Sequence, residues 1–323
     1  MTTTVVSQPP DAPPAHAPVS SIMSARRRRR RTPVTWVRGG GLSTLILGLP
    51  LLVIFGLFSW FPIVRATVMS VQTTNLVTAP VYVGLDNFTA VLADPLLGTA
   101  VTNTLYFALL ALVFGYPAPL VVAVLMSEVR RGKGVFSALA YLPVVVPPVV
   151  AVLLWKVFYD ASPDGVFNTI VGWVGLGPFP WLQDPSWAMP SLVLEATWAA
   201  AGGTIIIYLA ALTGVAPELY DAAEVDGAGV WRKVWHVTLP QLRGILFITL
   251  ILQVIGTAQV FLEPYLFTNG GPANSTTTIM LMIYNYAFQF GDYGKATALS
   301  LMLAAVLAVL STVYFKATSS WSK

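Results

Sequence analysis

The sequence predicts an all-α membrane protein with six spanning helices, and three observations carry this prediction. The chain of 323 residues is 56% hydrophobic and only 10% charged, whereas soluble domains carry about 25% charged residues. Its mean hydropathy is +0.72. Long windows free of Asp, Glu, Lys and Arg recur along it. Because so few charges cannot cover the surface, we expect lipid to be the solvent for most of the chain.

Residue usage excludes several kinds of site. The chain contains no cysteine, which excludes disulfides and thiolate metal sites. Its two histidines, His16 and His236, leave little room for a histidine-based metal or acid–base centre. The isoelectric point near 9.3 could indicate nucleic-acid binding, but orientation in a membrane explains an excess of Lys and Arg better. We therefore expect no metal and no nucleic-acid partner.

The first 38 residues form a segment without a predicted core. The stretch "SQPPDAPPAHAPVS" is rich in Pro and Ala and is predicted to be disordered. The six arginines after it, Arg26–Arg31, could be a nucleic-acid patch or an export signal, but a topology anchor attracted to anionic lipid is favoured. The next apolar run exceeds the roughly 7–15 residues of a signal peptide. We expect residues 1–38 to be cytoplasmic and residues 39–72 to hold an uncleaved first transmembrane helix.

A spanning helix needs about 20 mainly apolar residues. The windows without charge that satisfy this are Gly39–Val64, Pro95–Ser127, Gly134–Trp155, Ala196–Pro217, Gly244–Leu262 and Ala296–Phe315. Two further uncharged stretches are interrupted by Gly, Pro and Trp (Gly165–Gln183) or by Asn, Thr and Tyr (Pro264–Gly291). We predict that these two are connecting loops or interfacial segments.

The distribution of positive residues predicts the orientation of the spans. If the N-terminus is cytoplasmic, 15 of the 18 Lys and Arg residues lie inside, and only Arg65, Lys156 and Lys295 lie near outer ends. The opposite orientation would place those 15 outside. We therefore expect both termini in the cytoplasm, together with the polar segment 217–240.

Segment 217–240 is predicted to contain two short helical pieces separated by a turn. Pro217 followed by Glu218 suits a helix start, and "ELYDAAEVDGA" then forms a helix that breaks near Gly227. In "GVWRKVWHV" two valines and two tryptophans recur at helical spacing. Such a piece could lie in the membrane interface or dock into the groove of another protein.

The spacing in this segment resembles the cytoplasmic "EAA" loop of the permease subunits of ATP-binding-cassette (ABC) importers. That family has Glu-Ala-Ala, then Gly after three intervening residues, then Ile-x-Leu-Pro after nine more. This sequence has Asp221-Ala222-Ala223, then Gly227, then Val237-Thr238-Leu239-Pro240. Asp replaces Glu and Val replaces Ile. The resemblance implies that the loop is a coupling helix seated in a cleft of an ATPase subunit, with Asp221, Ala222, Ala223, Gly227, Leu239 and Pro240 as coupling residues.

Other stretches extend the resemblance over residues 97–316 and narrow it to carbohydrate importers. They are "FPIVRATVMS", "VGLDNF" with "TNTLYF", "LPVVVPPVVAVLLWKVF", and "FTNGGPANSTTT" followed by "YNYAF" and "GKATALS". The implied fold is that of type I ABC importer permeases, with a six-helix core in residues 97–316. The implied location is the bacterial inner membrane, and the implied cargo is a sugar or a derivative such as glycerol phosphate.

The resemblance also implies the partners. They are a second permease subunit that forms a heterodimer, a cytoplasmic ATPase dimer, and an extracytoplasmic binding protein that delivers the sugar. The sequence contains no GxxxxGK[ST] phosphate loop. We therefore expect no catalytic residue and no cofactor on this chain, with ATP and Mg²⁺ bound by the partner ATPase.

Polar residues on two predicted spans are candidates for the substrate pathway, because polar groups in a membrane helix usually face a cavity. They are Thr197, Trp198, Ala200 and Gly203 on the fourth span, and Gln253, Thr257 and Val260 on the fifth. Packing between helices also uses Gln, Thr and Gly, and Trp198 could stack on a sugar or pack against lipid. Glu195 and Glu263 are expected near the outer ends of these spans, as interfacial or gate residues. Tyr284 and Asn285 are expected in an outer loop that contacts the binding protein.

Two other classes of function stay open at this point. A secondary transporter driven by an ion gradient would favour inverted repeats and paired acids in the centres of helices; no repeat is found, and the predicted helix centres lack acids. A membrane anchor without transport would not need the matched loop. Co-purification with an ATPase would separate the importer from both.

The predicted topology can be tested directly because the chain has no cysteine. Single cysteines at Thr3, Ser186 and Ser322 should differ in reactivity toward a membrane-impermeant maleimide added to intact cells. We expect labelling from outside at position 186 alone. Labelling of either terminus from outside would reverse the orientation.

Overall fold

The computed structural model describes residues 41–129 and 131–318, and nearly all of the regular structure there is helical. This confirms the predicted all-α class. The predicted disordered segment 1–38 lies outside the described residues. The chain divides into two compact units, residues 1–61 and residues 62–323, of which the second holds the rest of the architecture.

The first apolar helix continues past the charge-free window Gly39–Val64 and ends within the predicted residues 39–72. The described part of the first unit consists of helix α2 (Gly41–Phe55) and the π-helical turn η2 (Gly56–Trp60). Helix α3 (Phe61–Ser70) opens the second unit. The whole helical run, Leu42–Ser70, qualifies as a membrane span by length and composition. It therefore ends six residues after the predicted Val64.

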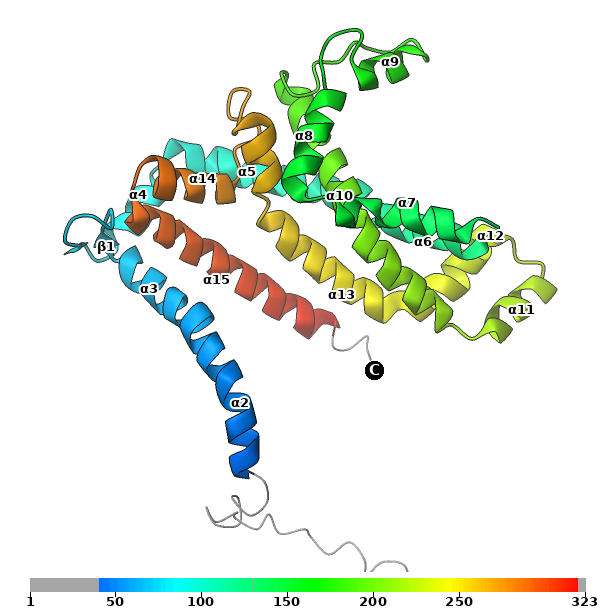
Figure 1. Cartoon of the computed structure of the whole chain (residues 1–323), viewed down its shortest axis with the longest axis horizontal. Helices are drawn as coiled ribbons and strands as arrows, with labels where there is room; N and C mark the ends of the chain where they lie inside the picture. Colours follow the sequence, from blue (N-terminus) through cyan, green and yellow to red (C-terminus); the bar gives the residue numbers. More distant parts are fainter. Residues whose placement is uncertain (1–40, 130, 319–323) are drawn as a thin grey trace, which may run out of the picture. The chain divides into compact units, whose positions relative to one another are not determined.

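The second unit is a bundle of long helices with shorter elements at its ends (Figure 1). After α3 come β1 (Gln72–Thr73), β2 (Val81–Tyr82), α4 (Asp86–Leu92), α5 (Pro95–Leu110), η3 (Ala111–Gly115), α6 (Pro117–Glu128), α7 (Lys133–Val145), α8 (Pro148–Phe158), α9 (Val166–Gly172), α10 (Pro185–Thr213), α11 (Pro217–Val225), α12 (Val230–Lys233), η4 (Val234–Thr238), α13 (Leu239–Ala258), η5 (Pro264–Thr268), α14 (Ile279–Tyr284), η6 (Asn285–Gln289) and α15 (Tyr293–Thr318). The strands pair antiparallel, Gln72 with Tyr82 and Thr73 with Val81.

Within the described residues, five helical runs are long and apolar enough to cross a membrane, or six if the bent pair α7–α8 counts as one crossing. The five are Leu42–Ser70, Pro95–Glu128, Pro185–Thr213, Val230–Ala258 and Tyr293–Thr318. Each overlaps one predicted window. The predicted number of six spans therefore depends on whether the remaining window, Gly134–Trp155, forms one membrane crossing.

That window is not the straight helix that was predicted. Helices α7 and α8 meet at an angle of 104°. Between them Val146 and Pro147 are extended, with ψ of 125° and 134°. The cause is the pair Pro147-Pro148, because a proline pushes the residue before it out of the helical region. Neither piece, at about 1.5 Å per residue, reaches across a hydrocarbon core of about 30 Å alone.

Helix α10 begins eleven residues before the predicted start at Ala196. The Asp184 carboxylate caps it by accepting a hydrogen bond from the Ser186 N–H (2.7 Å), and Pro185 occupies the first turn. These are favourable start signals. Glu195 consequently lies inside the helix and is only 2% exposed. The expectations that it sits near the end of the helix and that helix centres lack acids were wrong, because a search for charge-free windows stops at the first acid.

The segment 264–291, predicted to be a connecting loop or an interfacial segment, is partly helical. It contains η5, α14 and η6. Its threonines are buried because the fold supplies backbone partners: Thr278 Oγ1 donates to the Val260 carbonyl at 3.0 Å. Tyr284 and Asn285 are half-buried in this helical part and do not lie on an exposed outer loop.

The other predicted loop, 165–183, contains the short helix α9 and is organised by one buried side chain. The Asn168 amide donates to the carbonyls of Asp160, Ser162 and Phe179, and its oxygen accepts from the Phe179 N–H and the Trp181 indole. Beyond α9, Trp173 is 79% exposed. The stretch connects α8 to α10, as predicted, and its placement in the membrane interface stays a prediction.

Three of the π-helical turns end two residues before a proline. They are η2 before Pro62, η3 before Pro117 and η4 before Pro240. A proline lacks the N–H and its ring collides with the carbonyl four residues earlier. The wider turn relieves this and uses bonds five residues apart, such as Tyr116 N–H to the Ala111 carbonyl at 2.7 Å. The helices thereby continue through their prolines, as the lack of water in lipid requires.

Helix α10 is the centre of the bundle and contacts α5, α6, α7, α8 and α13. Its approach to α7 depends on Gly202, which is buried. A methyl group there would lie 2.6 Å from the Ala140 carbonyl oxygen and 2.7 Å from Val144 Cγ2. The neighbouring Gly203 faces open space, with no atom within 4 Å of an added methyl group.

The two adjacent glycines form a matched pair for testing this packing. Glycine inside a helix costs about 0.5–1 kcal/mol relative to alanine, so Gly203→Ala should raise the melting temperature slightly. Gly202→Ala gains the same propensity but overpacks the contact with α7, which typically costs about 1–3 kcal/mol, and should lower it. Thermal unfolding in detergent, monitored by size-exclusion chromatography, gives the comparison. Equal melting temperatures for the two variants would contradict the close contact.

Candidate functional site

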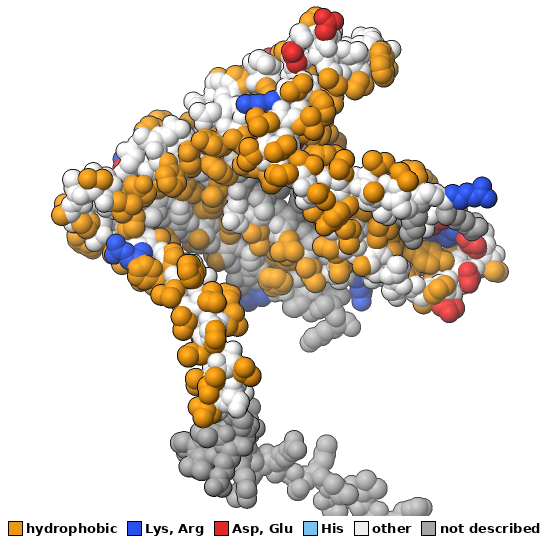
Figure 2. Space-filling model, in the orientation of Figure 1, with side chains coloured by type: hydrophobic (Ala, Val, Ile, Leu, Met, Phe, Trp, Pro, Cys, Tyr) orange, Lys and Arg blue, Asp and Glu red, His pale blue; other side chains and the backbone are white. Residues whose placement is uncertain are grey.

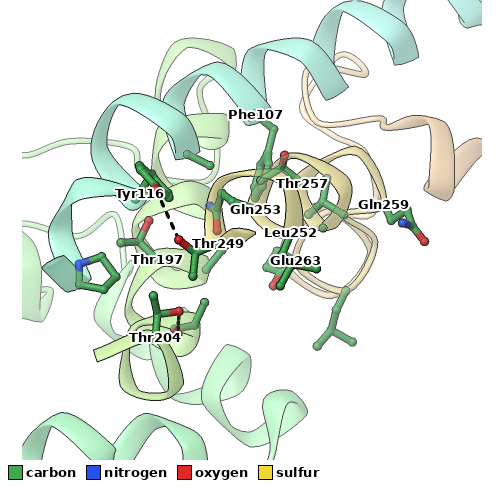
Figure 3. Close-up of a pocket in the computed structure, with 18 of the residues that line it drawn as sticks. Phe107, Tyr116, Thr197, Thr204, Thr249, Leu252, Gln253, Thr257, Gln259 and Glu263 are labelled. Carbon is green, nitrogen blue, oxygen red and sulfur yellow. Dashed lines mark hydrogen bonds between the residues drawn. The ribbon is translucent and has the colours of Figure 1, made fainter. Parts of the chain in front are cut away.

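A cavity of about 560 Å³ lies between α5, η3, α6, α10 and α13. Its volume falls in the range of about 300–1,000 Å³ that is usual for small-molecule sites. Its polar lining consists of hydroxyl and amide groups and one carboxyl group, while the rest is aliphatic or aromatic (Figure 3). Such a lining suits a ligand with many hydroxyl groups and apolar faces.

Three of the lining residues converge at one point of the wall. A methyl group on Gly115 would lie 2.8 Å from Thr197 Oγ1 and 3.8 Å from Gln253 Nε2. Gly115, at the end of η3, thus lets the polar groups of α10 and α13 come together. Within the described residues the Gln253 amide has no hydrogen-bond partner, so its polar atoms are available to a ligand.

A chain of hydroxyl groups joins the walls nearby. The Tyr116 hydroxyl donates to the Leu246 carbonyl at 2.6 Å and lies 3.4 Å from Thr249 Oγ1 (dashed line in Figure 3). The Tyr208 hydroxyl lies 2.9 Å from the same Thr249 oxygen. Because Tyr208 is on α10 and Thr249 is on α13, this network ties the two helices of the predicted pathway together.

Five of the seven predicted pathway residues line the cavity. They are Thr197, Ala200, Gln253, Thr257 and Val260. Trp198 and Gly203 are not among the residues that line it. The predicted stripe on α13 is therefore a cavity wall along part of its length, although its role in transport stays a prediction.

Trp198 packs against other aromatic side chains inside the protein. Its ring centroid lies 5.6 Å from that of Trp155 on α8. Both belong to an apolar cluster that includes Phe107, Tyr159 and Phe267. The cluster joins α8 to α10 and η5, beside one end of the cavity.

Two carboxyl groups lie at the end of the cavity remote from α11. Glu263, directly before η5, is half-buried and lines the cavity. Burial raises the pKa of the Glu263 carboxyl above its usual range. Glu195 is buried on α10 and interacts electrostatically with Glu263.

The predicted coupling loop forms a hairpin at the other end of α10 and α13. Helix α11 carries Asp221, Ala222 and Ala223, of which the first two are exposed. Gly227 has φ of +72°, and nothing lies within 4 Å of an added methyl group. The predicted break at this glycine is confirmed, since only glycine reaches this region without strain. The second piece, α12 and η4, continues directly into α13, so Leu239 and Pro240 form the start of the long helix.

Two side-chain contacts hold the hairpin closed. Lys233 Nζ lies 2.7 Å from Glu224 Oε1, which joins α12 to α11 across the turn. The Tyr220 hydroxyl lies 3.1 Å from Thr238 Oγ1. The hairpin still exposes large apolar groups, with Val225 at 89% and Trp231 at 73%, and acidic side chains gather around α11 (Figure 2). This surface suits docking to another protein.

Sequence reasoning missed Gly115, Tyr116, Thr204 and Thr249 as lining residues. Tyr116 and Thr249 belong to apolar windows in which one hydroxyl group is not unusual. Gly115 has its role only through contacts with two other helices. The short stretch "FGYPAP" could have drawn attention, because a glycine and a proline inside a span indicate an irregular helix.

Comparison with known proteins identifies the family. Residues 115–317 match the model of the binding-protein-dependent transport system inner membrane component. The chain belongs to this family, the permeases of ABC importers.

Two relatives and one solved structure illustrate what this permease is similar to. The lactose transport system permease protein LacF of Rhizobium radiobacter is 33% identical over 83% of this chain and 91% of its own. The trehalose/maltose transport system permease protein MalF of Thermococcus litoralis is 30% identical over 83% and 90%. A chain of a bacterial ABC transporter that imports the acidic polysaccharide alginate matches with a TM-score of 0.76 and 27% identity over 89% and 98%. The similarity confirms the type I importer permease fold and gives the secondary-transporter alternative no support.

The cavity wall leads to a prediction for Gln253. Gln253→Leu removes an amide that has no partner within the described chain, so assembly should be normal. Transport should weaken, because losing a hydrogen bond to a buried ligand group costs about 1–3 kcal/mol. Uptake kinetics of the assembled transporter measure this.

The matched control is Gln259→Leu. Gln259 also lines the cavity, but its amide donates to the Ile255 carbonyl and points away from the other labelled polar groups (Figure 3). We expect near wild-type uptake for this variant. Wild-type rate and apparent affinity in Gln253→Leu would mean that the stripe serves packing only.

Proposed function

We propose that this chain is one permease subunit of an ATP-driven importer that moves a sugar across the bacterial cytoplasmic membrane. A binding protein outside the membrane delivers the sugar, and a cytoplasmic ATPase dimer supplies the energy by hydrolysing ATP with Mg²⁺. The second permease subunit is a different chain, and the two together enclose the pathway. Both termini of this chain face the cytoplasm.

The hairpin of α11 and α12 is the observation that carries this proposal. It presents a short exposed helix, an acidic residue at the first position of the three-residue motif, and a glycine turn with positive φ. It connects α10 directly to α13, and these two helices contribute half of the residues that line the cavity. An ATPase that grips this hairpin can therefore move the cavity walls without contacting the membrane interior.

Sugar as the cargo is supported by two independent observations. The curated relatives transport lactose and trehalose or maltose according to their names. The cavity combines Thr and Gln side chains with aromatic and aliphatic walls, and sugars present hydroxyl groups around apolar ring faces. The size of the cavity, about 560 Å³, allows a small saccharide.

The coupling role of the hairpin can be tested at Gly227. Gly227→Trp places a large side chain on an exposed turn with φ of +72°, where it should spoil docking but not membrane insertion. The variant should reach the membrane in normal amounts and lose most of its association with the ATPase or of sugar-stimulated ATP hydrolysis. Co-purification and ATPase assays on the assembled transporter measure both.

Gly175→Trp is the matched control for backbone strain. Gly175 also has positive φ, +77°, and open space around it, but it lies beyond α9, on the opposite side from the hairpin. Coupling should survive this change. Normal ATPase binding and transport by Gly227→Trp would remove the hairpin as the coupling element.

A further inference from the structure

The charges around the cavity are all of one sign. Of the charged residue types, only Glu263 is among the side chains that line it; no Lys, Arg or His lies in the described lining (Figure 3). The remaining polar groups are neutral hydroxyls and amides. An anionic ligand in this cavity would find hydrogen-bond donors but no positive charge.

A second carboxyl group lies behind this wall. Glu195 directly precedes the lining residues Ala196 and Thr197, is 2% exposed, and its Oε2 atom has no hydrogen-bond partner. Glu263 lies close enough for the two carboxyl groups to interact electrostatically.

The described lysines that form ion pairs do so elsewhere, since Lys233 pairs with Glu224 and Lys295 with Asp292. Neither of these lysines pairs with Glu195 or Glu263.

We propose that Glu263, with Glu195 behind it, makes the cavity selective against sugars that carry a negative charge, such as phosphorylated sugars and uronic acids. The inference rests on the proposed carbohydrate import and narrows its substrate class to uncharged and amine-bearing sugars. Moving an anion out of water without a counter-charge is costly. The ionised Glu263 carboxylate adds repulsion, and the described lining offers no positive charge to offset it.

The fold itself does not impose this selectivity. The structurally similar chain, 27% identical, belongs to a transporter of the acidic polysaccharide alginate. The same helical framework therefore serves an anionic cargo elsewhere, and the side chains of the cavity must decide. Glu263 is the lining residue whose charge a substitution can remove or reverse.

The electrostatic potential of the cavity can be measured without knowing the sugar. In the assembled importer, Gln253→Cys introduces one thiol into this cysteine-free chain. Its rates of modification by a cationic and an anionic methanethiosulfonate reagent of similar size are compared by mass spectrometry of this chain. Ser186→Cys, at the exposed start of α10, is the reference thiol. If the thiol at position 253 is shielded, Thr204→Cys provides a second one in the same wall.

The preference for the cationic over the anionic reagent should be on the order of a hundredfold greater at the cavity thiol than at the reference thiol, because a unit charge roughly 10 Å away at an effective dielectric constant of about 20 changes each rate by more than tenfold, in opposite directions. Adding Glu263→Gln should reduce this preference, and Glu263→Lys should reverse it. Glu263→Asp should keep it, which separates charge from side-chain shape. Equal preferences at the cavity and reference thiols, or no response to Glu263→Lys, would overturn the inference.

Uptake measurements distinguish this inference from the proposed function. Proteoliposomes with the complete importer and its binding protein are tested with radiolabelled lactose, maltose, a glucosamine-containing disaccharide and a disaccharide uronic acid. Rapid uptake of the uronic acid by the wild-type importer would refute the selectivity and leave sugar import intact. Reagent selectivity without uptake of any sugar would leave the potential as described and remove the proposed function.

Discussion

The close approach of α10 to its neighbours is the constraint on which the rest of the structure depends. Gly202 brings the backbone of α7 to a distance at which a single methyl group would collide with it. Thr197, five residues earlier on the same helix, lies against Gly115 of η3 and forms part of the cavity wall. Helix association in lipid gains little from the hydrophobic effect and relies on such close contacts between small residues. Gly202 thus keeps α10 close to α7, while Thr197 and Ala200 on the same helix line the cavity.

The sequence could predict which segments cross the membrane but not how they bend. Twenty apolar residues are visible in any window, and each of the five long runs overlaps one predicted span. The bend of 104° between α7 and α8 and the π-helical turns depend on how the backbone around each proline is accommodated. At Pro117 and Pro240 the helix continues through a wider turn, whereas at Pro147-Pro148 it breaks. The early start of α10 was not predicted for a different reason. Glu195 is buried inside the helix, but a window that must contain no charged residue cannot include it.

The candidate site likewise contains residues that the sequence could predict and residues that it could not. The hairpin could be predicted because its residues are neighbours in sequence, and the structure gives Gly227 the positive φ that the motif suggested. The stripe Gln253, Thr257 and Val260 could be predicted because its spacing is that of one helix. Gly115 and Tyr116 could not, since each reaches the cavity from another element and acts through contacts with α10 or α13. Trp198 shows the opposite error: a residue expected beside the pathway faces an aromatic cluster instead.

The topology of the hairpin explains how an event at α11 reaches a cavity located further along the helices. Only Gly214, Val215 and Ala216 separate α10 from α11, and the turn around Gly227 separates α11 from α12, which is continuous with α13. The Glu224–Lys233 ion pair spans that turn and joins α11 to α12. Further along, the Tyr208–Thr249 hydrogen bond links α10 to α13 at the cavity itself. In the proposed coupling, a displacement of α11 would therefore reach both walls together. The third wall, formed by η3 and α6, is tied to α13 as well, because the Tyr116 hydroxyl contacts Leu246 and Thr249.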